Sequence, residues 1–326
     1  MFGKQYAAEM INRSAENDTD RRRFLRSAGL AGFGVVGVST VGGLGAGAAS
    51  AETAADAQAL SDASVLNFAL NLEYLEAQFY LHAVRGKGLP GSLTSGKGDE
   101  GGVTGGRRVP FRSKSIRQYA EEIAVDELQH VRFLRTALGE ARVAQPAIDL
   151  KRSFTAAAQA AGIVGPGEKF DAFACEANFL LAAFLFEDVG VTAYKGAAPL
   201  IQNKTYLEAA AGILAAEAYH AANIRTSLLS TKSKPLGIDL PFLPGFGRDL
   251  AQAANKLSDA RDSLDGDTDL DQRVTDGDDH ANIVPTDEFG VCFSRSAPQV
   301  LNIVYLTNKA ARTGGFFPKG VNGEIN

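Results

Sequence analysis

Four long segments of the chain carry apolar residues at intervals of three and four, the spacing that lines one face of an α-helix. They lie at about 61–86, 115–140, 171–195 and 205–230. Ser61 is well placed to cap the first segment, because a serine side chain accepts a hydrogen bond from a free N–H of the first helical turn. The third segment is apolar at nearly every position and should be the most buried. This pattern predicts an all-α protein built on a four-helix bundle.

The segments between these helices differ in length and composition. Residues 86–113 are rich in glycine, serine and lysine, which predicts an exposed loop that is either tolerated surface or a lid. After the second helix come Pro146, a short alanine-rich helix at 154–161 and the turn Gly165-Pro166-Gly167. We therefore expect a long crossover between the second and third helices of the bundle.

The character of the chain changes at Lys234, beyond which proline, glycine and aspartate are frequent and only 246–263 keeps a helical pattern. We expect a bundle at 52–233 and a largely irregular extension at 234–326 that packs on it. The run from Asp265 to Asp271 looks like a calcium loop. However, leucine replaces the required glycine and Asp276 the required glutamate, which favours a solvated acidic turn.

The first 51 residues are typical of an export signal. Asp20-Arg-Arg-Arg-Phe-Leu-Arg26 has the twin-arginine form, a weakly apolar stretch follows from Ser27 to Ala48, and small residues at 49–51 form a cleavage site. We expect removal near Ala51 by the twin-arginine export machinery, with a retained membrane anchor as the alternative. The mature protein would then be periplasmic or extracellular, with no stable membrane span.

Composition adds limits on function. The chain has 326 residues, of which 45% are apolar and 22% charged, as in an ordinary soluble globule. A net charge of -5, with basic residues dispersed beyond the N-terminus, gives no reason to expect nucleic-acid binding. Cys175 and Cys292 lack metal-type or redox-type spacing. Cys175 is interpreted as a buried inert thiol, and a disulfide between the two after export stays open.

Two copies of Glu-x-x-His, Glu127 to His130 and Glu217 to His220, contain two of the four histidines. Residues three apart on a helix are neighbours, so each motif directs a carboxylate and an imidazole to one point. Both pairs lie on the apolar face of their helix. A buried carboxylate without compensation is costly, whereas metal coordination compensates its charge. The motifs therefore predict metal ligands.

The two motifs belong to an internal repeat. Aligned on their glutamates, the segments 123–138 and 213–228 share Ile, Glu, His, Arg-Thr and Leu at the same offsets. The helix before each motif repeats as well, because each has a glutamate with a tyrosine seven residues later. Each half is thus a helix pair, and the predicted metal ligands are Glu73, Glu127, His130, Glu187, Glu217 and His220.

Glu76, one turn beyond Glu73, competes with it as a ligand. The repeat favours Glu73, because Gly190 stands at the position equivalent to Glu76 whereas Glu187 matches Glu73. Glu76 is then expected beside the ligands, not among them.

Tyr80 and Tyr194 occupy matched positions near the expected site. They are either hydrogen-bond donors to a ligating carboxylate across the bundle or amphipathic core residues. His82 and His280 have no partner motif, and we interpret both as ordinary surface residues.

Four carboxylates and two imidazoles from four helices resemble the ligand set of di-iron and di-manganese bundles, so the chain resembles the ferritin-like superfamily. More closely, it resembles the ferritin-like family that includes the desiccation-related proteins. The segments that carry this likeness are Leu66–Glu76, Phe179–Tyr194 and Gly314–Gly320. The likeness spans about 61–326 and implies a ferritin-like bundle with two iron or manganese ions.

Such a site would leave coordination positions open for oxygen or peroxide. We therefore expect a redox enzyme, ferroxidase-like or catalase-like, or a stress protein that limits oxidative damage outside the cytoplasm. The alternative is a structural or protective desiccation protein without turnover. A storage cage is disfavoured because the long loop and extension would obstruct shell packing. Nothing in the sequence excludes a homo-oligomer.

Overall fold

The structure is a computed structural model that describes residues 60–231, 250–276 and 280–326. The predicted export signal at 1–51 and the start of the helix expected at 246–263 lie outside the described residues. The predicted all-α fold is confirmed. The described helices are α3 (Asp62–Arg85), α4 (Lys114–Leu138), α5 (Arg152–Ala160), α6 (Glu176–Ala197), α7 (Lys204–Ser230), α8 (Leu250–Asp265) and α9 (Ala297–Tyr305).

Short strands and turns connect the helices. The strand pairs are β1 (Val103–Thr104) with β2 (Ile148–Asp149), which are parallel, and β3 (Thr275–Asp276) with β4 (His280–Ala281), which are antiparallel. Single 3-10 turns lie at Gly91–Leu93, Gly139–Ala141 and Ala198–Leu200. Because β1 pairs with β2, the long loop after α3 is fastened to the crossover that leads into α5.

Local chemistry sets the ends of the bundle helices. The side chains of Ser61, Ser113 and Asn203 accept hydrogen bonds from N–H groups in the first turns of α3, α4 and α7. Gly86 ends α3 in the left-handed conformation with φ of 72°, and its N–H bonds the carbonyl of His82. α6 begins at Glu176, later than the expected start near Asp171, because Cys175 is extended at its N-cap.

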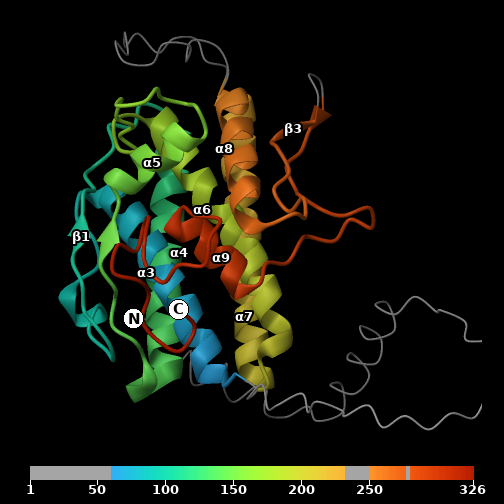
Figure 1. Cartoon of the computed structure of the whole chain (residues 1–326). Coiled ribbons are helices and arrows are strands. Elements are labelled where there is room, and N and C mark those ends of the chain that lie inside the picture. The colour runs from blue at the N-terminus through green and yellow to red at the C-terminus, as the bar shows by residue number, and fades with distance from the viewer. Residues whose placement is uncertain (1–59, 232–249, 277–279) are drawn as a thin grey trace, which may run out of the picture.

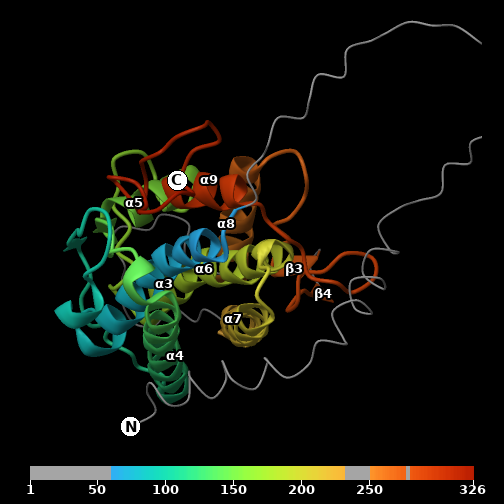
Figure 2. The same ribbon diagram turned by 90° about the horizontal axis from the view of Figure 1, so that it is seen from below.

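The bundle consists of two helix hairpins, α3 with α4 and α6 with α7 (Figure 1). Seen from below, α3 and α6 lie between α4 and α7 on one side and α5, α8 and α9 on the other (Figure 2). α6 is long and apolar enough to cross a membrane, but 94% of its apolar window is buried here, as in the core helix of a soluble protein. α6 is thus a core helix as predicted, but it is not more buried than α3, whose side chains are buried along almost its whole length as well.

Aromatic rings fill the core between the bundle and the C-terminal extension. Phe79 of α3 stacks on Phe179 of α6 with ring centroids 5.4 Å apart. Phe316, from the extension, lies 4.9 Å from the ring of Phe186 and 5.0 Å from that of Phe154. The extension therefore shares the hydrophobic core of the bundle. It also contains α9, a helix that the sequence analysis missed although Ser296 and Gln299 form a capping box at its start.

A buried network of arginines and aspartates joins the extension to α6 and α7. Asp188 of α6 accepts hydrogen bonds from Arg225 of α7 and Arg261 of α8, and Asp271 pairs with Arg295 at 2.6 Å. The expected solvated acidic turn is therefore wrong for Asp265 and Asp271, which are buried. Both pair with Arg295, whose guanidinium replaces the water that an isolated acidic turn would need.

Candidate metal centre

The six predicted ligands meet in the middle of the bundle. Each comes from one of four helices: Glu73 from α3, Glu127 and His130 from α4, Glu187 from α6, and Glu217 and His220 from α7. All six are buried, with exposed fractions from 0% to 9%. The four helices pack around one centre, α3 on α4, α6 on α7, α3 on α6 and α4 on α7, so each directs one glutamate, and α4 and α7 also a histidine, into the same space.

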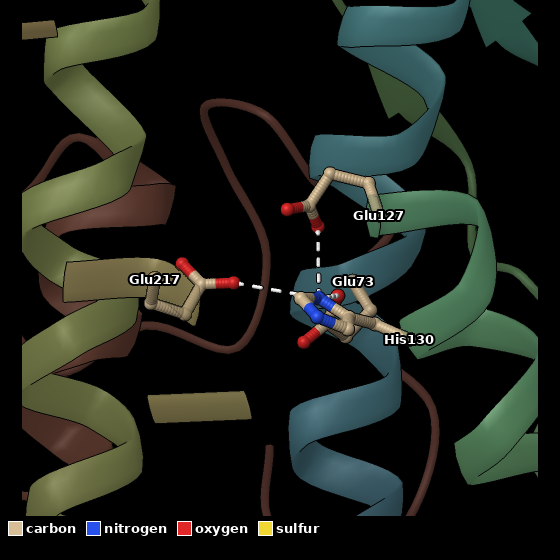
Figure 3. Close-up of side chains that lie close together, drawn as sticks. All are labelled: Glu73, Glu127, His130 and Glu217. Carbon is tan, nitrogen blue, oxygen red and sulfur yellow. Dashed lines mark ion pairs between the residues drawn. The ribbon is translucent and has the colours of Figure 1, made fainter. Parts of the chain in front are cut away.

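A first group of ligand atoms surrounds His130. Its Nδ1 lies 3.2 Å from Glu73 Oε2 and 3.6 Å from both Glu127 Oε2 and Glu217 Oε1. Figure 3 shows the carboxylates of Glu127 and Glu217 directed at the imidazole from α4 and α7, with Glu73 close behind it on α3. One ligand atom from each of these four residues lies within 4.8 Å of every other, a spacing that one ion can bridge.

A second group surrounds His220. Its Nδ1 lies 3.3 Å from Glu127 Oε1 and 3.5 Å from Glu187 Oε2. Glu127 therefore directs one oxygen at each histidine, and the two imidazole rings are 6.3 Å apart between centroids. A carboxylate shared in this way is the arrangement that holds two ions side by side.

The ligand atoms are buried without hydrogen bonds. Eight atoms of this cluster have no hydrogen-bond partner within the described part of the chain: Glu73 Oε2, both carboxylate oxygens of Glu127 and of Glu217, Glu187 Oε2, and the Nδ1 atoms of His130 and His220. Each buried polar atom that is left without a hydrogen bond costs roughly 1–3 kcal/mol of folding free energy. Cations at the two groups would satisfy them together, so the residues present fit two metal ions.

The charges of the cluster are strongly coupled. Burial raises the pKa of Glu73 to about 7, against the opposing pull of His130. Burial raises the pKa of Glu217 well above its ordinary value, and the carboxylate of Glu76 adds to the effect. Burial acts on Glu127 in the same direction, but the two neighbouring histidines overcome it and hold its pKa well below the usual range. Without metal, therefore, part of the cluster stays protonated at neutral pH.

Both tyrosines hydrogen-bond a predicted ligand across the bundle. The hydroxyl of Tyr80 on α3 donates to Glu187 Oε1, and that of Tyr194 on α6 donates to Glu73 Oε1. Of the two alternatives weighed from the sequence, the structure shows the cross-bundle bond. In each case one carboxylate oxygen accepts from the phenol and leaves the other facing the cluster, so each tyrosine fixes the orientation of one glutamate.

Asp126 is a site residue that the sequence analysis missed. Its Oδ2 lies 3.2 Å from His220 Nε2, which leaves His220 Nδ1 free to face the carboxylates. The repeat gives no signal for it, because Ala216 stands at the equivalent position of the second half.

Glu76 and Gly190, which occupy equivalent positions in the two halves of the repeat, both lie beside Glu217. A Cβ added at Gly190 would come within 2.2 Å of Glu217 Oε2 and 3.5 Å of Glu76 Oε1. A side chain at position 190 would therefore force the carboxylate of Glu217 to move from its place in the cluster. Glu76 is buried next to the cluster but belongs to neither group of candidate ligand atoms, as the repeat predicted.

The remaining candidate residues lie elsewhere. His280 is exposed, as expected. His82 is half-buried, and burial lowers its pKa, so its interpretation as an ordinary surface residue is wrong. The loop after α3 folds over it at Gly106, where an added Cβ would lie 2.6 Å from the imidazole. Cys175 is buried at the start of α6, and both it and Cys292 are free thiols.

Comparisons with known proteins agree with this architecture. The family model described as a ferritin-like domain matches residues 61–230. The chain is 31% identical over 278 residues to the desiccation-related protein PCC13-62 of Craterostigma plantagineum, a match that covers 81% of this chain and 84% of that protein. It is 24% identical over 272 residues to the ferritin-like catalase Nec2 of Nesocodon mauritianus, covering 81% and 85% of the two chains. No solved structure matches the chain.

Proposed function

Since the chain belongs to the ferritin-like domain family, we propose that its bundle holds two iron or manganese ions and uses them in oxygen or peroxide chemistry that protects against oxidative or desiccation stress. The observation that carries the proposal is the set of eight buried candidate ligand atoms on six side chains that have no hydrogen-bond partner among the described residues. A core can tolerate them when cations compensate their charge. Oxygen-rich ligation with one imidazole per ion suits iron or manganese better than zinc or copper.

The protein's own residues would prepare the centre for this chemistry. When bound, the ions supply redox equivalents and open coordination positions for a small oxidant. Tyr80 and Tyr194 hold Glu187 and Glu73 in place, and Asp126 orients His220. Burial raises the pKa of Glu76, which lies beside Glu217, well above its ordinary value, so in the metal-free site this carboxyl favours its protonated form. The site would therefore combine fixed ligands with a further buried carboxyl group beside them.

The relatives support a protective role but differ in what their names state. One is named a catalase and the other a desiccation-related protein. The first favours disproportionation of peroxide. The second favours an alternative in which the chain is a structural protective protein, and its metals stabilise the fold without turnover.

Export is part of the proposal and rests on the sequence alone. The twin-arginine motif at Asp20–Arg26 and the small residues near Ala51 support cleavage and release into the periplasm or the extracellular space. The twin-arginine machinery carries folded proteins, which suits a chain that loads its metals in the cytoplasm.

The test is metal analysis of the purified full chain, together with assays of peroxide disproportionation and oxygen consumption. We expect close to two iron or manganese ions per chain and turnover with one of the two oxidants. His220→Ala should lose metal and turnover, whereas His280→Ala, a change at an exposed histidine, should keep both. Two ions without turnover would favour the structural alternative, and a metal-free protein of normal stability would contradict the proposal.

A further inference from the structure

A cavity lies against the candidate metal centre, between α3, α6 and the C-terminal extension. α3 contributes Leu72, Leu75 and Glu76 to its wall, and α6 contributes Leu185, Phe186, Val189, Gly190 and Tyr194. Its volume is about 20 Å³, on the measure in which one water needs roughly 10–15 Å³. The cavity therefore has room for a small molecule.

The cavity reaches the ligands at Gly190. An added Cβ there would lie 2.2 Å from Glu217 Oε2. Because glycine has no side chain, the cavity wall at Gly190 lies directly beside this candidate ligand carboxylate. Glu76 lies on the same wall, 3.5 Å from that point. The repeat explains this shape, because Gly190 is equivalent to Glu76: one half of the bundle places a carboxyl here and the other places nothing.

The extension closes the outer side of the cavity. Ile303 and Val304 of α9 and Phe316 line it. Val304 is fixed to Phe316 by a backbone hydrogen bond of 2.8 Å, and the carbonyl of Phe316 accepts a bond of 3.0 Å from Asp149. In Figure 2 helix α9 of the extension lies on the α3 and α6 side of the bundle, away from α4 and α7. The bundle helices alone would leave this side of the cavity open.

The lining is almost wholly apolar. Its polar members are Glu76 and Tyr194, and the Tyr194 hydroxyl already donates to Glu73. A peroxide molecule has two O–H donors and would find few partners here. Burying a polar group without a partner costs roughly 2–7 kcal/mol. Dioxygen has no such groups, and apolar cavities of proteins bind apolar gases such as xenon.

We propose that this cavity is a binding site for dioxygen next to the metal centre, formed jointly by α3, α6 and the C-terminal extension. Its role in turnover rests on the proposed function, in which dioxygen is either the reactant of an oxidase or the product of peroxide disproportionation. Its affinity for an apolar gas rests on the cavity alone.

The proposal is tested by diffraction from crystals of the full chain under xenon pressure. We expect a xenon peak bounded by Glu76, Gly190 and Val304. Val304→Phe should abolish it by filling the cavity. Val321→Phe, the same change at a similarly buried position of the extension away from the cavity, should keep it. Phe316→Leu, which enlarges the cavity, should raise xenon occupancy and serves as a second variant if Val304→Phe does not fold.

Kinetics distinguish the role of the site from the metal proposal. With iron loaded and reduced, Val304→Phe should slow oxidation by dioxygen several-fold and leave oxidation by added peroxide unchanged if dioxygen enters here. If dioxygen only leaves here, steady-state peroxide disproportionation slows instead. Metal content should stay that of the unsubstituted protein in both cases. A missing xenon peak, or an ordered water in its place, would overturn the cavity proposal even if two ions bind. A xenon peak in a protein that fails to bind any metal would refute only the proposed function.

Discussion

Raising the pH from 5 to 8 should destabilise the metal-free protein. Burial raises the pKa of Glu73 from the ordinary value of 4.5 to about 7, and the pKa values of Glu76 and Glu217 rise further for the same reason. His130 is also raised well above its ordinary value, because Glu73 and Glu127 overcome the effect of its burial. Each of these groups binds a proton more tightly in the folded protein than in the unfolded chain. Stability from such groups is complete below the unfolded pKa and is lost as pH rises through the folded pKa.

The size of the effect follows from Glu73. The interval from 4.5 to about 7 corresponds to roughly 3 kcal/mol, at about 1.4 kcal/mol per pH unit. For a domain of this size that is a decrease in Tm of roughly 6–12 °C. The raised pKa values of Glu76, Glu217 and His130 act in the same direction as that of Glu73. Bound metal should reverse the trend, because ligands must lose their protons to coordinate it and metal affinity rises with pH.

The assay is thermal and urea unfolding of the chelator-treated and metal-loaded proteins, followed by circular dichroism between pH 5 and 8. Glu73→Gln retains the shape of the side chain but cannot titrate, so its metal-free form should lose roughly 3 kcal/mol less over this range. Glu122→Gln, an exposed change on α4, should behave as the unsubstituted protein does. A metal-free Tm that stays constant or increases between pH 5 and 8 would refute the argument that the cluster is held together by buried protons.

Three further predictions concern the ligands, the glycine beside them and the arginine network. Glu127→Ala should abolish metal binding while circular dichroism shows an unchanged helix content, and retention of both ions would show that Glu127 is not a shared ligand. Gly190→Ala should weaken metal binding in a chelator competition, because its Cβ would lie 2.2 Å from Glu217 Oε2, whereas Gly212→Ala, at an open position of α7, should have no effect. Asp188→Asn should lower the free energy of unfolding by roughly 3–5 kcal/mol in urea, because it leaves the buried guanidinium groups of Arg225 and Arg261 short of an anionic partner; a loss under roughly 1 kcal/mol would show that other anions of the network compensate.

The meeting of the six candidate ligands could be predicted because it depends on local spacing and on the internal repeat. Glu127 and His130 lie three residues apart on one helix, so their common direction follows from helix geometry without knowledge of any contact. The repeat then extends the prediction to the second half and selects Glu73 over Glu76. The tyrosine positions followed from the same spacing, but their hydrogen bonds did not. Whether the hydroxyl of Tyr80 reaches Glu187 depends on the distance between α3 and α6, and the sequence pattern does not predict this distance.

The residues that were missed or misinterpreted depend on contacts between distant segments. Asp126 lies on α4, yet its partner His220 is on α7, and no periodicity links them. The acidic run at 265–271 was interpreted as solvated because its partner Arg295 lies far along the chain. His82 is covered by the turn at Gly106, whose path depends on the pairing of β1 with β2. In each case the sequence gives the residue type, and the burial comes from the tertiary fold.

The two halves of the duplicated bundle keep the same six candidate ligands but differ at several positions next to the centre. Asp126 supports His220, while Ala216 offers nothing equivalent to His130. Glu76 adds a buried carboxyl on one side, while Gly190 leaves room for Glu217 on the other. A scaffold kept only for stability would gain nothing from such asymmetry, because the same six ligands would brace the helices equally well in a symmetric site. If the proposed two ions bind, this asymmetry would make them inequivalent and would place an apolar cavity on one side of the centre, which suits a reaction with one small oxidant.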